Sequence, residues 1–237
     1  MRRKIEDQQE SLQSFAMVIV HDLRAPLRGI LQATEMLTED LPDEIVAENA
    51  EMLGFVHQGA QRMDALIISL NDSSQIDSTP PAFEAVDLKV QMDRVCSNLW
   101  SVISDSGAKV ICGSNLPTIQ GSPPQIEQLL QNLICNAIKY NRSDAPEIRI
   151  EATHLSDRWE ISIADNGIGI EPQFLKRIFE PFKRLHGNDE FEGSGLGLAT
   201  CRKITARHNG RLTCDSVPGA GSTFRVHLPF SPDAGQI

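Results

Sequence analysis

The chain has 237 residues, and its 22 basic and 32 acidic side chains give a formal net charge of −10. At about 100–200 residues per domain, this length predicts one large or two small domains. The negative charge argues against broad nucleic-acid binding, because it repels a polyphosphate backbone. The longest apolar run, Phe15 to Val20, is much shorter than the roughly 20 residues that span a bilayer, so we expect no membrane insertion.

Cysteine usage and the first residues predict a cytoplasmic location. The five cysteines are odd in number, widely spaced and without a C-x-x-C pair, in a chain long enough to fold without disulfides. Arg2, Arg3 and Lys4 precede a polar stretch in place of the apolar core of a signal peptide. The pattern favours a reduced compartment and indicates no targeting segment.

Residues 1–80 hold 6 basic and 14 acidic side chains, a net charge of −8, and their pattern is helical. Apolar residues recur every three or four positions, which predicts one long amphipathic helix, a break at Pro42, a second helix over 45–70 and a linker over 71–81. Two antiparallel helices with a one-sided apolar stripe cannot bury it alone. We therefore expect a homodimeric four-helix bundle formed through residues 10–75.

Residues 81–237 mix strand and helix patterns. Helical periodicity predicts helices over 88–104, 123–141 and 196–208, and alternation of apolar and polar residues predicts strands over 147–152, 159–164, 211–215 and 222–228. Interleaved strands and helices predict a two-layer α/β sandwich. The fold class expected for the whole chain is α+β, with a helical domain over 1–80 and an α/β domain over 81–237.

The predicted helix 123–141 carries two carboxamides on one face. Asn132 and Asn136 are one turn apart, and Lys139 and Tyr140 follow them. Carboxamide oxygens can bind a hard cation, and a nearby lysine can hold phosphate. On their own, paired asparagines on a helix are more often exposed or capping.

Two glycine-rich segments follow. Asp165-Asn166-Gly167-Ile168-Gly169 lies where a predicted strand ends; its carboxylate can accept a hydrogen bond from an exocyclic amine such as that of adenine, although a plain turn fits the glycines equally well. Gly193-Ser194-Gly195-Leu196-Gly197-Leu198 opens a predicted helix whose N-terminal amides favour phosphate. It is not a dinucleotide fingerprint, which needs Gly or Ala where Leu198 stands, and no Walker lysine follows.

In this order and spacing, the three elements resemble the ATP-binding domain shared by sensor histidine kinases, gyrase, heat-shock-90 chaperones and mismatch-repair ATPases. Phe179-Glu180-Pro181-Phe182 resembles the phenylalanine box of the kinases, and residues 216–224 resemble their closing turn and strand. The resemblance implies ATP and Mg²⁺ as cofactors, with Asn136 as the metal ligand, Asp165 as the adenine reader and residues 183–196 as a mobile lid. The cofactor-binding residues expected on this basis are Asn132, Asn136, Lys139, Tyr140, Asp165, Gly167, Gly169, Lys183, Arg184, Gly193, Gly195, Leu196, Gly197 and Thr223.

His21 is the predicted nucleophile. Neutral imidazole has a free ring nitrogen near neutral pH, and Asp22 beside it can take the proton from the other nitrogen. Pro26 crowds the carbonyl of Asp22 and should bend the helix there, which leaves room for docking. The run His21-Asp22-Leu23-Arg24-Ala25-Pro26 resembles the phosphoacceptor box of histidine kinases, whose commoner form is His-Glu-Leu-Arg-Thr-Pro.

Together these motifs resemble the catalytic core of sensor histidine kinases over about residues 10–230, in a form similar to kinases attached to phytochrome-type or PAS sensors. The resemblance implies transfer of the ATP γ-phosphoryl group to His21 and then to an Asp of a response-regulator receiver domain, under an upstream sensor domain or subunit. The alternatives are a degenerate, dimeric nucleotide-sensing scaffold and an ATPase-type conformational switch.

Two positions sharpen this interpretation. The ATP-hydrolysing branch has a Glu where this chain has Asn132, which is a poor base, so we expect bound ATP to await another nucleophile and count Asn132 with the catalytic residues His21 and Asp22. Related kinases that also act as phosphatases have Thr or Asn where Ala25 stands. Ala25 cannot orient a water molecule, which predicts little phosphatase activity.

Overall fold

The structure is a computed structural model that describes residues 23–78, 82–185, 191 and 193–230. Its contacts divide the chain into two units. The described residues of these units are a helical part (residues 23–78) and an α/β part (residues 82–185 and 195–230).

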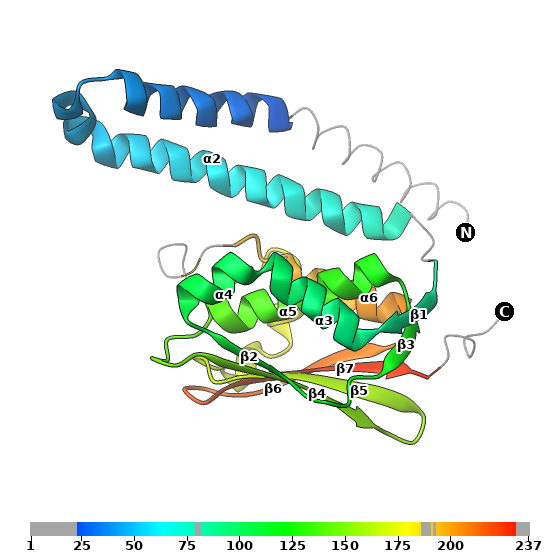
Figure 1. The fold of residues 1–237 in the computed structure, drawn as a ribbon. Coiled ribbons are helices and arrows are strands. Elements are labelled where there is room, and N and C mark those ends of the chain that lie inside the picture. Colours follow the sequence, from blue (N-terminus) through cyan, green and yellow to red (C-terminus); the bar gives the residue numbers. More distant parts are fainter. Residues whose placement is uncertain (1–22, 79–81, 186–190, 192, 231–237) are drawn as a thin grey trace. The chain divides into compact units, whose positions relative to one another are not determined.

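The helical part is a pair of helices joined by a short turn (Figure 1). The first is helical over residues 23–40, and α2 spans Asp43–Ser78. Pro42 separates them, and its carbonyl accepts hydrogen bonds from Ile45 N–H at 2.9 Å and Val46 N–H at 3.1 Å, which start α2. The break predicted at Pro42 is therefore confirmed.

The predicted start of the linker is wrong. Helix α2 continues through Asn71-Asp72-Ser73-Ser74 and ends only at Ser78, just before Thr79-Pro80. Asn, Asp and Ser each cost a helix less than about 1 kcal/mol relative to Ala, whereas Pro costs about 3 kcal/mol. A run of such residues at the end of a long helix is too weak a signal to stop it.

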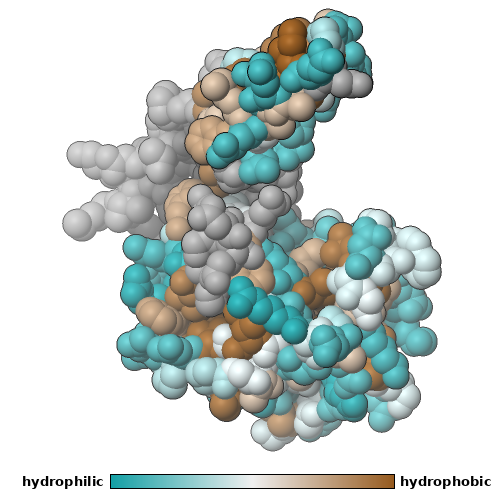
Figure 2. Space-filling view, turned by 90° about the vertical axis from the view of Figure 1, so that its left-hand side faces the viewer, coloured by the Kyte–Doolittle hydropathy of each residue, from teal (hydrophilic) through white to brown (hydrophobic). Residues whose placement is uncertain are grey.

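The helical part buries few apolar residues. Its core consists of Leu27, Ala60 and Ile67, with Leu31 packed against them. Many other large apolar side chains remain exposed, as the brown patches on the helices in Figure 2 illustrate. These exposed side chains are Leu23, Ile30, Met36, Leu37, Ile45, Met52, Phe55, Val56, Met63 and Leu66.

The α/β part is a mixed sheet with helices packed on one face (Figure 1). Its five strands lie in the order β2-β4-β5-β7-β6, and all neighbours are antiparallel except β2 and β4. The sheet consists of β2 (Lys109–Cys112), β4 (Glu147–His154), β5 (Arg158–Asp165), β6 (Arg211–Val217) and β7 (Gly221–Pro229). The helices are α3 (Leu88–Asn98), α4 (Trp100–Ser106), α5 (Pro123–Lys139) and α6 (Gly197–Arg207), with 3-10 turns at Pro172–Phe174 and Arg177–Phe179.

The core of this part lies between the sheet and its helices. Alternate residues are buried along part of each central strand, and one face of α5 is buried against them. The most deeply buried side chains include Ile126, Leu129, Leu133, Ile134, Ile148, Ile150, Ile163 and Ile204. The predicted two-layer α/β sandwich is therefore confirmed.

The predicted elements differ from the structure in two places. The helix expected over 88–104 is divided at Leu99 into α3 and α4. Three short strands were not predicted: β2, and the pair β1 (Glu84–Asp87) and β3 (Thr118–Gly121), which form a separate two-stranded sheet. Four residues are too few for an alternating pattern to stand out from a loop.

Candidate nucleotide site

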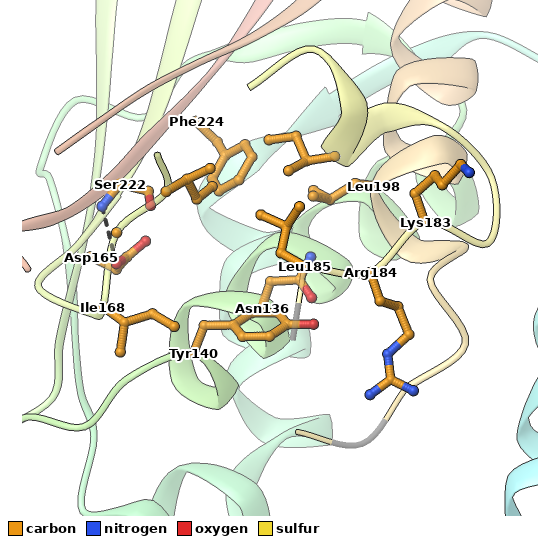
Figure 3. Close-up of a pocket in the computed structure, with 13 residues that line it drawn as sticks. Asn136, Tyr140, Asp165, Ile168, Lys183, Arg184, Leu185, Leu198, Ser222 and Phe224 are labelled. Carbon is orange, nitrogen blue, oxygen red and sulfur yellow. Dashed lines mark hydrogen bonds between the residues drawn. The ribbon is translucent and has the colours of Figure 1, made fainter. Parts of the chain in front are cut away.

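The α/β part contains a cavity of about 80 Å³. Figure 3 shows the side chains that line it. Helix α5, the loop after β5, residues 183–185, the start of α6 and the start of β7 all contribute to it. Its lining residues are Asn136, Tyr140, Asp165, Ile168, Gly169, Ile170, Ile178, Lys183, Arg184, Leu185, Leu198, Ser222 and Phe224.

Asp165, the last residue of β5, provides the carboxylate of this cavity. Its Oδ1 accepts hydrogen bonds from Gly167 N–H at 2.9 Å and Ser222 N–H at 3.2 Å. Both bonds go to Oδ1, so Oδ2 is available to a ligand. Burial raises the pKa of Asp165 and the two amide donors oppose this rise, with a net shift upward. The site therefore holds an oriented hydrogen-bond acceptor in partly apolar surroundings.

Two glycines allow the loop after β5 to touch the turn between β6 and β7. Gly169 has a φ of +70°, and a Cβ there would collide with the carbonyl of Val217. Gly221 has a φ of +100°, and a Cβ there would collide with the carbonyl of Asp165. Gly219 N–H also donates to Ile168 O at 2.8 Å. The position of Asp165 thus depends on contact between two distant loops.

Helix α5 brings Asn136 and Tyr140 to the cavity, one turn apart. The neighbouring Lys139 does not line it. Its Nζ lies 3.2 Å from the Tyr140 hydroxyl and 4.7 Å from the centre of the Tyr140 ring. Lys139 thus contacts the ring that forms one wall of the cavity.

Asn132 lies one turn further back on α5 and does not line the cavity. Its side chain opposes, in part, the rise that burial causes in the pKa of the Cys201 thiol on α6. A Cβ on Gly197, the first residue of α6, would lie 3.6 Å from Asn132 Oδ1. The amide is therefore directed at the first turns of α6.

The other predicted residues divide between the cavity and its surroundings. Gly169, Lys183 and Arg184 line it, in addition to Asn136, Tyr140 and Asp165. Phe182 N–H donates to Gly195 O at 3.0 Å, which joins the two ends of the segment predicted as a lid. The predicted residues that do not line the cavity are Asn132, Lys139, Gly167, Gly193, Gly195, Leu196, Gly197 and Thr223.

Sequence reasoning missed Ser222, which lines the cavity where Thr223 was expected to. Buried and half-buried residues alternate along β7, and Ser222 lies on the helix-covered side with Phe224. The signal that could have identified Ser222 is its even spacing from Phe224 in a predicted strand. His21 and Asp22 lie outside the described residues.

The sequence matches two family models. Residues 121–232 match the histidine kinase-, DNA gyrase B- and HSP90-like ATPase, and residues 11–79 match the His kinase A (phospho-acceptor) domain. The chain belongs to the histidine kinases. The resemblance noted from its motifs is therefore confirmed.

Curated relatives of this histidine kinase chain include two phytochromes. It is 39% identical to cyanobacterial phytochrome A of Nostoc sp., over 95% of this chain and 29% of that protein. It is 34% identical to phytochrome-like protein Cph1 of Synechocystis sp., over 97% of this chain and 31% of that protein. The chain thus spans about 30% of the length of these relatives.

Solved structures share the fold. Full-length ShkA in complex with AMPPNP matches with a TM-score of 0.69 and 23% identity, over 94% of this chain and 47% of that one.

None of the described helices is both long and apolar enough to cross a membrane.

Proposed function

We propose that this chain is the catalytic core of a two-component sensor histidine kinase, which transfers the γ-phosphoryl group of ATP to His21 and then to an Asp of a response-regulator receiver domain. The observation that carries this proposal is the cavity beside Asp165, which lies within the match to the ATPase family. The other family match contains His21 in a phosphoacceptor domain.

The cavity suits the base of ATP. Asp165 offers a carboxylate acceptor, and Tyr140 and Phe224 contribute ring walls (Figure 3). Pockets that enclose a whole ligand measure about 300–1,000 Å³, so we assign the adenine to this smaller space and expect the phosphates to extend out of it past Asn136, Lys183 and Arg184. Lys183 and Arg184 line the same cavity, and their positive charges suit the phosphates.

Asn136 is the residue that we assign to Mg²⁺. Its amide oxygen is a hard donor in the cavity, and Mg²⁺ that binds together with a nucleotide needs only one or two protein ligands besides phosphates and water. Among the described residues, no three His, Cys, Asp or Glu side chains form a metal cage. When bound, the ion would neutralise phosphate charge.

His21 is the proposed acceptor, with Asp22 to take its second ring proton. Asn132 supports transfer to a protein nucleophile over hydrolysis, because an amide cannot accept a proton from water. An ATPase-type switch is therefore less well supported than a kinase.

The exposed apolar residues of the helical part support the proposed homodimer. Leu23, Ile30 and Leu37 recur at intervals of seven, as do Ile45 and Met52 on α2, and all of them are exposed. Such a repeat is typical of helices that pack against further helices in a bundle. A second copy of the hairpin would cover these side chains and form a four-helix bundle.

The proposal extends to the setting of the kinase. Because its relatives include phytochromes about three times as long, we place a sensor domain or subunit upstream. Unpaired cysteines at all five positions agree with a cytoplasmic location. The net negative charge does not favour a nucleic-acid partner.

Incubation with γ-labelled ATP and Mg²⁺ tests the function. Acid-labile, base-stable label on the protein is expected for a histidine kinase, free phosphate for an ATPase switch and bound intact ATP for a scaffold. His21→Ala should abolish the label while ATP binding remains. The matched control is His57→Ala, which removes a half-buried histidine of α2 that hydrogen-bonds Gln61 on its own helix at 2.9 Å. Label that persists in His21→Ala would refute the proposed acceptor.

A further inference from the structure

Two serine hydroxyls meet beside Asp165, where β6 and β7 approach the cavity. Ser216 Oγ and Ser222 Oγ lie 2.9 Å apart. Ser222 lines the cavity next to Asp165 (Figure 3), whereas Ser216 is not among the lining residues. Ser216 could therefore influence a bound ligand only through its neighbours.

The hydroxyl of Ser216 makes two hydrogen bonds to the backbone. It accepts a hydrogen bond from Ile170 N–H at 2.8 Å and donates its single proton to Gly221 O at 2.8 Å. A backbone N–H can only donate and a carbonyl can only accept, so both directions are fixed. The one remaining lone pair of Ser216 is then an acceptor for Ser222.

This arrangement determines the direction of the Ser222 hydroxyl. Since Ser216 has no second proton, Ser222 must donate its own proton to Ser216. The Ser222 oxygen then presents only lone pairs to the cavity. Asp165 Oδ2 is also an acceptor, because both amide donors bond to Oδ1. The acceptors Ser222 Oγ and Asp165 Oδ2 can both receive hydrogen bonds from an amino group of a ligand. A carbonyl oxygen at the same place would be repelled, because it too is only an acceptor.

We propose that Ser216 is a positioning residue for base selection: through Ser222 it keeps this part of the cavity free of hydroxyl donors, which favours a 6-amino purine over a 6-oxo purine. This inference rests on the proposed nucleotide-binding function and deepens it. It differs from a general structural role of Ser216, which would affect both purines equally.

The test compares ADP with IDP, which carry an amino group and a carbonyl at the same ring position. Their dissociation constants for the full chain are measured by calorimetry with Mg²⁺. In Ser216→Ala the Ser222 hydroxyl can rotate and donate to the carbonyl, so the preference for ADP should fall by about three- to tenfold, the value of one hydrogen bond. Ser216→Thr keeps the hydroxyl and should keep the preference.

A double-variant cycle separates positioning from loosening. If Ser216→Ala acts only by removing the hydrogen-bond partner of Ile170 N–H, it should weaken the binding of ADP and IDP equally. The ratio of their dissociation constants would then stay unchanged. In a Ser222→Ala background, the addition of Ser216→Ala should not change the ratio further. Ser162→Ala is the matched control, because Ser162 lies on β5 within 3.4 Å of Glu151 O and does not line the cavity.

Each outcome decides a different point. Failure of the unmodified chain to bind ADP would refute the proposed function itself. If the unmodified chain prefers ADP and folded Ser216→Ala keeps the same preference, only the role of Ser216 is overturned. If Ser216→Ala does not fold, Ser216→Cys replaces it, and its weaker S–H donor should give a smaller fall; an unchanged ratio there would also overturn the role.

Discussion

Acidification below about pH 6.5 is expected to destabilise the α/β part through His208, which is 2% exposed. Its Nδ1 lies 2.8 Å from Ile204 O and therefore carries the proton, while its Nε2 accepts the N–H of Ser122 at 3.0 Å. The ring also stacks on Phe83 at a centroid distance of 4.7 Å. Both nitrogens have partners only when the ring is neutral.

The sign of the effect follows from the pKa. Burial lowers the pKa of His208 and the nearby Arg207 lowers it further, while the Ile204 carbonyl opposes them in part. Between the lowered pKa and about 6.5, the unfolded chain binds a proton that the folded chain does not. The stabilisation is therefore complete above about pH 6.5 and falls below it, by up to about 1.4 kcal/mol per pH unit.

The magnitude also follows from the contacts. A protonated Nε2 would direct its hydrogen at the Ser122 N–H, which would leave a buried donor without an acceptor. Such a loss costs about 1–3 kcal/mol. His208→Phe keeps a ring that can stack on Phe83 but removes the acceptor. We expect it to lower the free energy of unfolding by this amount at pH 7.5 and to flatten the pH dependence.

The assay is urea unfolding followed by tryptophan fluorescence between about pH 5.5 and 7.5. Both tryptophans, Trp100 and Trp159, lie in the α/β part, so the signal reports on that part. Burial also lowers the pKa of His227, and His227→Gln is the matched control. A slope that persists in His208→Phe and disappears in His227→Gln would refute the reasoning.

Three further predictions follow from the site and the helices. Asp165→Asn should weaken ADP binding about tenfold or more, because its NH₂ group would stand where Oδ2 now offers an acceptor to the amino group of the base. Unchanged binding by calorimetry would contradict the role of Asp165. A chain of residues 82–237 should be a monomer that binds ATP, and light scattering that shows a dimer would contradict the assignment of dimerisation to the helices. Ala25 is exposed on its helix, so Ala25→Thr in a His21→Ala background should gain phosphatase activity toward a phosphorylated regulator, measured as phosphate release.

The parts of the fold that the sequence predicts are those encoded locally. The periodic apolar residues of α5 and the alternation along β4 and β5 each lie within one element, and these elements form close to where the pattern places them. The pair β1 and β3 joins residues 84–87 to residues 118–121, across two helices and β2. Nothing within either short segment specifies that partner.

The same distinction applies to the site. Asp165 and Gly169 lie in one motif, and both line the cavity. The Ser216 hydroxyl, by contrast, bonds Ile170 across 46 positions, and no spacing rule relates the two residues. Asn132 is a further example: its place on α5 was predictable, but Gly197, which its side-chain oxygen approaches, belongs to α6.

Strand register explains why Ser222 lines the cavity and its neighbour Thr223 does not. Neighbouring residues of a strand point to opposite faces of a sheet, so an error of one position moves a side chain from one face to the other. The register pairs Ser222 with Ser216 and Thr223 with Asp215, and it also sets Thr223 opposite Ala164 on β5. Ser216 and Ser222 therefore lie opposite each other, and their hydroxyl oxygens are 2.9 Å apart. Strand register, which the tight turn at Gly219 and Gly221 fixes, thus decides which hydroxyl lines the cavity.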